Sequence, residues 1–222
     1  TNTLTTRIAS VLKEKRITRF TGNHKRGKLL ATNVYKIITG DRRPFSRKTN
    51  PNAPDYEFWL ALDASGSMGD SSYTGLLPIE ASYLSALMLK AIANKLNFPL
   101  NTYAFQDAPY KIDNLQEDYL QNYGGGTNET RMLEMIIEET SEPAVKDRIL
   151  FFITDGYIGG NTKPLLNQLE AQNFTTLGIS IGVTDPKANN MMRKLFPDNL
   201  IIDKPENLPG ALISKLKTLI HR

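Results

Sequence analysis

The chain has 222 residues, contains no cysteine and carries a formal net charge of +4 at pH 7. This length fits one domain of ordinary size with an added segment, and such a domain buries its core without disulfide or metal staples. The lack of cysteine excludes disulfides, thiolate metal sites and cysteine nucleophiles. No apolar run approaches the ~20 residues that span a bilayer, and no signal-peptide pattern opens the chain, so we expect a cytoplasmic location. Because the first residue is Thr1, we expect a piece of a longer protein.

The charge is distributed unevenly along the chain. Residues 1–56 carry 13 Lys and Arg against 3 acidic residues, a net charge of +10, and residues 57–222 carry 14 against 20, a net charge of −6. A basic arm on an acidic body can bind nucleic acid, an acidic partner or its own domain, and it can also be simply solvated. The composition therefore leaves the role of the arm open.

Residues 1–55 are predicted to form a basic helical extension. One short helix is expected at residues 4–16, where the apolar residues have the spacing of a single helix face, and a second at residues 29–38. Pro51 and Pro54 block regular structure between Thr49 and Asp55. We therefore place a linker there and begin the main domain, residues 56–222, at Tyr56.

From residue 56 onward, predicted strands alternate with predicted helices. Residues 56–62 are apolar apart from Glu57, as in a strand that is buried on both faces. Residues 78–96 are predicted to be a long helix, apolar nearly all round and so well buried. Further strands are expected at 100–105, 148–154, 175–183 and 199–202, with a short edge strand at 108–112, and further helices at 127–139, 163–172, 187–196 and 205–220. This alternation predicts an α/β fold, a three-layer sandwich with a mostly parallel central sheet and one short antiparallel edge strand.

Three segments place oxygen-bearing side chains where strands are predicted to end. LALDASGSMG follows the first strand and offers Asp63, Ser65 and Ser67, which point the same way on an extended segment because they are two apart. In YGGGTNET, three glycines allow a tight turn before Thr127. In ILFFITDG, Asp155 ends an apolar strand. Because ligands bind beyond the carboxyl ends of parallel strands, these side chains are candidate ligands of one ion.

Hydroxyl and carboxylate oxygens are hard ligands. Such a set suits Mg²⁺, Mn²⁺ or Ca²⁺ and not zinc or copper, and Mg²⁺ is the ion we expect. For Asp63, Ser65 and Ser67 alone, the plain alternative is a strand-end turn with capping serines. Asp70 is either a solvated loop residue or an extension of the acidic loop toward a second ion.

Asp63-x-Ser65-x-Ser67, a glycine-rich loop bearing Thr127, and Asp155 in an apolar-Thr-Asp-Gly context together resemble the metal ion-dependent adhesion site of von Willebrand factor A (VWA) domains. The resemblance covers roughly residues 56–222. It implies that the three hydroxyl residues touch the ion and that the two aspartates act largely through water. It also implies an open coordination position, which an Asp or Glu of a partner protein fills because the ion is short of direct carboxylates.

A looser resemblance covers nearly the whole chain. The stretch RITRFTGNHKRGKLLATNVYKIITGDRRPFSRK, followed by the first strand and LDASGSM, is similar to the carboxyl-terminal part of CobT-type cobaltochelatase subunits and their bacterial and phage relatives. This resemblance implies a non-catalytic subunit that works with a ring-shaped AAA+ ATPase of the MoxR/CobS type. Cobalt insertion, a step of cobalamin biosynthesis, is the activity of only some of these relatives, so the client stays open.

Other functions are weighed against this interpretation. A cell-surface adhesion domain would use the same metal site, and the basic arm weighs against it. A metal-dependent hydrolase needs a general base or nucleophile, and none stands near the site in sequence. His24 lies among basic residues that could touch phosphates, so a nucleic-acid-binding accessory role of the arm is kept as an alternative.

One further motif suggests a different chemistry. Gly178, Ser180 and Gly182 match the G-x-S-x-G pattern of a serine nucleophile. That pattern needs a sharp turn between a strand and a helix, and here it lies inside an apolar run of strand length. Glycine in such a strand more often marks close packing, and that is the interpretation we prefer.

Overall fold

The computed structural model describes residues 19–24, 28–29, 45–49, 56–70, 75–140, 147–156, 158–159, 161–182 and 185–220. Contacts divide the chain into two compact units, one formed by Ser10–Pro54 and the other by Thr1–Ala9 with Asp55–Arg222. Contacts within one chain do not show whether either part folds alone. The division into an arm, residues 1–55, and a domain, residues 56–222, therefore stays a prediction.

The larger unit is built on a six-stranded sheet with the order β6-β5-β4-β7-β8-β9. All neighbouring strands pair in parallel except β6, which is antiparallel to β5. The strands are β4 (Tyr56–Asp63), β5 (Leu100–Phe105), β6 (Pro109–Lys111), β7 (Asp147–Thr154), β8 (Phe174–Ile181) and β9 (Asp198–Ile202). A mostly parallel sheet with one short antiparallel edge strand is thus confirmed.

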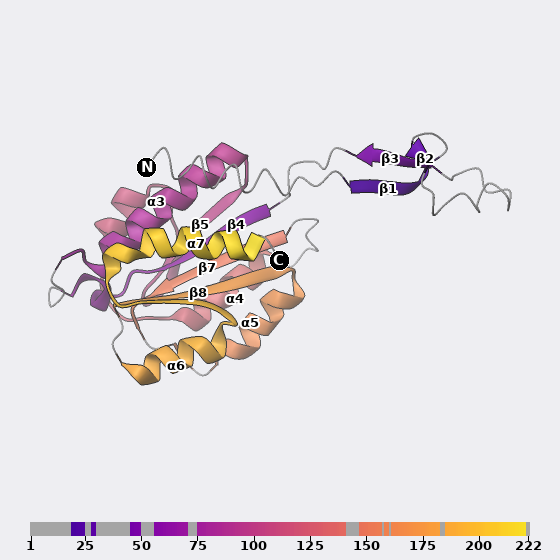
Figure 1. Ribbon diagram of the computed structural model, residues 1–222. Coiled ribbons are helices and arrows are strands. Elements are labelled where there is room, and N and C mark those ends of the chain that lie inside the picture. Colours follow the sequence, from indigo (N-terminus) through magenta and orange to yellow (C-terminus); the bar gives the residue numbers. More distant parts are fainter. Residues whose placement is uncertain are drawn as a thin grey trace. The chain divides into compact units, whose positions relative to one another are not determined.

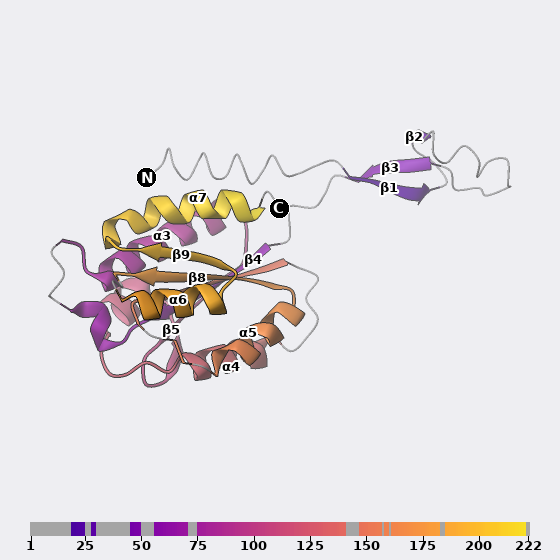
Figure 2. The same ribbon diagram turned by 60° about the horizontal axis from the view of Figure 1, so that its bottom comes forward.

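Helices cover both faces of this sheet and make it the middle of three layers (Figure 1). On one face lie α3 (Pro78–Leu96) and α7 (Leu208–Ile220), and on the other lie α4 (Glu129–Glu139), α5 (Thr162–Ala171) and α6 (Pro186–Leu195) (Figure 2). The two layers explain the continuous apolar run in β4. Phe58 and Leu60 are fully buried, and Trp59 and Ala61, which alternate with them, belong to the core cluster that includes residues of α4, α5 and α6.

The helix boundaries follow local capping chemistry. The helix predicted at 127–139 begins at Glu129, because the Asn128 side chain caps it by accepting a hydrogen bond from the Arg131 backbone amide at 3.1 Å. Helix α3 has the predicted bounds, but its burial on all sides was predicted wrongly, since Leu84 and Leu87 are exposed. Among the described residues, two short helices were not predicted, namely η2 (Gly66–Gly69) and the π-helix η3 (Leu115–Leu120). The helix predicted at 205–220 is divided into the short 3₁₀ helix η4 (Pro205–Asn207) and α7.

The sheet order places β4 at a topological switch point. From β4 the chain passes through α3 to β5 on one side, and it later returns to β7 on the other side of β4. In the parallel register, Leu62 of β4 lies opposite Ile153 of β7. The carboxyl ends of these two strands are therefore adjacent, at the point where open α/β sheets bind their ligands.

The described residues of the arm form strands. These are β1 (Arg19–His24), β2 (Lys28–Leu29) and β3 (Phe45–Thr49), which pair antiparallel in the order β1-β3-β2. For these residues the predicted helical extension was wrong. No individual helix was predicted at β1 or β3, and the phenylalanines and threonines of these segments favour strands. The helix expected at 4–16 and most of the one expected at 29–38 lie outside the described residues.

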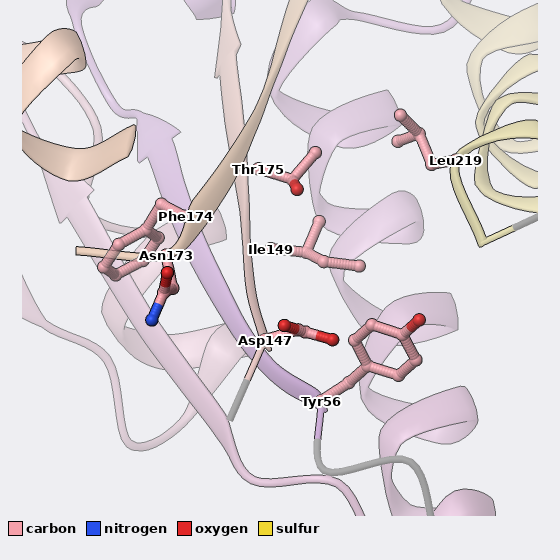
Figure 3. Close-up of a pocket in the computed structure, with 7 residues that line it drawn as sticks. All are labelled: Tyr56, Asp147, Ile149, Asn173, Phe174, Thr175 and Leu219. Atoms are coloured by element: carbon pink, nitrogen blue, oxygen red, sulfur yellow. The ribbon is translucent and has the colours of Figure 1, made fainter. Parts of the chain in front are cut away.

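A pocket of about 380 Å³ opens at the amino-terminal edge of the sheet. Its walls come from the first residues of β4, β7 and β8 and from the end of α7, with Tyr56 and Asp147 on one side and Thr175 and Leu219 on the other (Figure 3). The predicted ligands stand at the opposite ends of β4 and β7, so this pocket is separate from them. Within the part of the chain that the structure describes, no helix is both long and apolar enough to cross a bilayer.

Candidate metal site

Asp63 ends strand β4 and is fully buried. One of its carboxylate oxygens accepts a hydrogen bond from the Ser65 backbone amide at 2.8 Å, and the other accepts one from the Thr154 hydroxyl at 2.5 Å. Thr154 is the last residue of β7 and in turn accepts from the Gly156 amide at 3.0 Å. The carboxylate is therefore held rigidly between the two strand ends.

Ser65, Ser67 and Asp155 form a continuous chain of oxygens beside Asp63. The hydroxyl oxygens of Ser65 and Ser67 lie 3.1 Å apart, and the Ser67 hydroxyl donates to the Asp155 carboxylate at 3.0 Å. Ser65 is buried, Ser67 is exposed and Asp155 is partly buried. The fold thus brings four of the five predicted ligands together, with the open side of the group at Ser67.

The loop that carries Thr127 packs against the serine loop through its backbone. The Gly124 amide donates to the Ala64 carbonyl at 2.8 Å, and the Gly66 amide donates to the Gly125 carbonyl at 3.2 Å. Gly124 and Gly125 have φ angles of 151° and 71°, which residues with a side chain rarely adopt. Thr127 is exposed on this loop. Its role as a fifth ligand beside the two serines stays a prediction.

The two aspartates lie in an environment that disfavours negative charge. Burial raises the pKa of Asp63, although hydrogen bonds from Ser65 and Thr154 oppose the rise. Burial, followed by the charge of Asp63, raises the pKa of Asp155 to about 6. Each shift shows that the ionised carboxylate lacks full compensation in the protein alone.

Four residues that support these loops were not predicted. Asp107 accepts a hydrogen bond from the Gly126 amide at 2.9 Å, and Glu129 accepts one from the Gly159 amide at 2.6 Å. Tyr119 and Thr154 bond the backbone and the carboxylate of Asp63, respectively. The position of Asp107 and Thr154 at strand ends is a signal that sequence inspection could have used, but nothing in the sequence marks Tyr119.

One interpretation outside the metal site is also settled by position. Ser180 is buried within β8, and a Cβ atom on Gly178 would fall 2.4 Å from the Phe196 ring. The glycine marks close packing, as predicted, and Ser180 is no exposed nucleophile. Trp59 is buried and stacks on Tyr103, so it is a residue of the core. Asp70 is exposed, so the structure leaves its predicted alternatives open.

Comparison with known proteins gives likeness at the level of the fold. No family model matches the chain, and no curated protein matches it. Among solved structures, proximal thread matrix protein 1 from the mussel byssus is similar to 75% of this chain, with a TM-score of 0.54 and 16% identity. The same mussel protein with a zinc-occupied MIDAS motif matches 74% of this chain, with a TM-score of 0.56 and 14% identity. In both comparisons this chain covers 46% of the mussel protein's length. Sheet order, layers and these matches together show that the six-stranded sheet and its helices have the VWA-type, Rossmann-like α/β fold.

Proposed function

We propose that this chain is a non-catalytic protein-interaction domain that holds a divalent cation at Asp63, Ser65, Ser67, Thr127 and Asp155. Through that ion it grips a carboxylate of a partner protein. The observation that carries the proposal is the chain of hydrogen-bonded oxygens from Ser65 through Ser67 to Asp155, beside the buried Asp63 carboxylate. Hydrogen bonds between side chains that are all suited to cation binding are replaced by metal–oxygen bonds when an ion enters.

The donor set fits a hard cation. Within the described ranges, no group of three or more His, Cys, Asp or Glu side chains is placed to hold a metal, so hydroxyl groups supply much of the ligand set. We propose Mg²⁺, with Mn²⁺ and Ca²⁺ as ions that the same oxygens accept. The mussel protein's zinc-occupied MIDAS motif supports the binding of a divalent ion in this fold. Zinc is therefore an ion to compare with Mg²⁺ in binding experiments.

The partner that we propose is a ring-shaped AAA+ ATPase of the MoxR/CobS type. Support comes from the resemblance of residues 16–48 and of LDASGSM to CobT-type subunits. In such a complex this chain would couple the ATPase to a client, and a cytoplasmic location follows from that partnership. We include in this proposal that the complex carries out the cobaltochelatase reaction.

The test is retention of the ATPase on the immobilised chain from a lysate of the source cells, with Mg²⁺ or with EDTA. The variants are Ser67→Ala and Asp155→Asn, and the matched control is Ser214→Ala, which removes an exposed serine hydroxyl from α7. We expect a MoxR/CobS-type ATPase, identified by mass spectrometry, that is retained with Mg²⁺ by the wild type and the control only. Retention in every condition would move the contact to the basic arm and make the ion structural.

A further inference from the structure

Few large apolar side chains of the described residues are strongly exposed. Leu84 and Leu87 are 44% and 38% exposed, and Tyr123 is 41% exposed. The two leucines lie on α3, whereas Tyr123 lies on the loop before Gly124, beside the candidate metal site. An exposed aromatic ring at a ligand loop is a typical anchor of a protein interface.

The backbone on both sides of Tyr123 is fixed by hydrogen bonds. On one side, the Gly124 amide donates to Ala64 at 2.8 Å. On the other, the Asn122 amide donates to the Tyr119 carbonyl at 3.3 Å, and the Asn122 carbonyl accepts from the Tyr110 hydroxyl at 3.1 Å. The backbone that carries the ring is therefore held in place before any partner arrives, which lowers the entropy cost of binding.

The ring also occupies a place that only glycine leaves free. A Cβ atom on Gly69 would fall 2.0 Å from Cε2 of Tyr123, so one side of the ring lies directly on the Gly69 backbone. Gly69 is two residues after the predicted ligand Ser67, in the short helix η2. The ring thus lies against the same short helix that carries Ser67.

We propose that Tyr123 is a second contact point for the partner segment that supplies the carboxylate, and that it packs against an apolar side chain of that segment. This inference rests on the proposed function and adds a sequence requirement to it. The partner segment carries an Asp or Glu for the ion and, within a few residues, a Leu, Ile, Met or Phe for the ring. Asp70 follows Gly69 and carries a negative charge. A basic side chain of the partner is therefore the alternative to an apolar one, and the experiment has to distinguish the two.

The test uses heptapeptides displayed on phage, with a fixed central Asp and random flanking positions. The full chain is the bait, peptides are bound with Mg²⁺, and elution is with EDTA. We expect one flanking position to be enriched in apolar residues about 5- to 10-fold over chance on the wild type and on Tyr123→Phe, which keeps the ring. We expect that enrichment to vanish on Tyr123→Ala and to persist on the matched control Leu84→Ala/Leu87→Ala.

Each other outcome overturns a stated part. Enrichment that survives Tyr123→Ala, or that falls equally in the leucine control, overturns the role of Tyr123. Enrichment of Arg or Lys that depends on Tyr123 overturns the apolar partner. If EDTA elutes no enriched peptides from any bait, the metal-bridged function fails and this inference fails with it.

Discussion

The Ser67 hydroxyl donates a hydrogen bond to the Asp155 carboxylate at 3.0 Å, although the two residues stand 88 positions apart in the sequence. The fold itself thus brings four of the five predicted ligands together, and a cation that joins them should stabilise the domain. At a Mg²⁺ concentration 100 times the dissociation constant, the gain in unfolding free energy is about 2.7 kcal/mol, which raises Tm by roughly 5–10 °C in a domain of this size. Differential scanning fluorimetry with Mg²⁺ and with EDTA measures it. Ser67→Ala should lose most of the Mg²⁺-dependent rise, and Ser214→Ala should keep it.

Removing the charge of Asp155 should stabilise the protein in EDTA. Its pKa of about 6 lies above the ordinary value of 3.8, so the folded state holds the proton more tightly than the unfolded state. The associated stability is present below pH ~4 and is lost as pH rises through about 6. After a discount for partial exposure, Asp155→Asn should gain about 1–2 kcal/mol at pH 7.5 and little at pH 4.5.

Urea unfolding in EDTA at the two pH values checks the sign of this effect. The control is Glu170→Gln, which neutralises an exposed carboxylate on α5. An Asp155→Asn variant that is less stable than the wild type at pH 7.5 in EDTA would show that the carboxylate is compensated within the protein. In Mg²⁺ the order should reverse, because the variant loses part of the attraction for the ion.

Tyr119→Phe should destabilise the domain without touching the surface of the site. The buried Tyr119 hydroxyl lies 2.7 Å from the Asp63 carbonyl and 2.9 Å from the Ser82 hydroxyl, and Phe leaves both without that partner. The expected loss is about 1–3 kcal/mol. Chemical denaturation measures it, with Tyr110→Phe as the control, since that half-buried hydroxyl contacts two carbonyls at 3.1 Å and water can replace it. Equal losses in the two variants would contradict the argument from burial.

Gly178→Ala should be among the most disruptive single-methyl changes in the sheet. The added Cβ atom would fall 2.4 Å from the Phe196 ring and 2.6 Å from the Met192 sulfur, and both side chains are buried. Overpacking of this kind costs about 1–3 kcal/mol. Gly210→Ala, on helix α7 with open space around its Cβ position, should instead gain about 0.5–1 kcal/mol. Thermal unfolding of the two variants, which add the same methyl group, gives the comparison directly.

Periodicity and element length were enough to predict the main sheet and its helices. The strand at Leu100–Phe105 and the helix at Pro78–Leu96 have the predicted bounds because each is bounded by proline or turn residues and buried by the other layers. The exposed face of α3 was missed, since Leu84 and Leu87 read as core residues in a sequence. Whether an apolar side chain is covered depends on the neighbouring helix, and no local pattern records that.

The candidate ligands were predictable because they follow strands at fixed spacing. Their supports were not, because Tyr119 and Glu129 act through backbone groups far away in the sequence. In the arm, the general expectation of a helical extension was wrong for β1 and β3, which pair as strands. Strand pairing joins residues on opposite sides of a turn, and a periodicity that is read within one segment does not include those partners.

The switch point between β4 and β7 has a consequence for how a bound ion would act on the chain. The predicted ligands come from three loops that the sequence keeps far apart, and the serine loop meets the other two through hydrogen bonds and through the Tyr123 ring on Gly69. An ion shared among them is a reversible cross-link, one that forms and breaks with cation supply instead of redox chemistry. Such a cross-link would slow hydrogen exchange at all three loops together. With the ion bound, a partner would meet one rigid surface, and without it three loops that move separately.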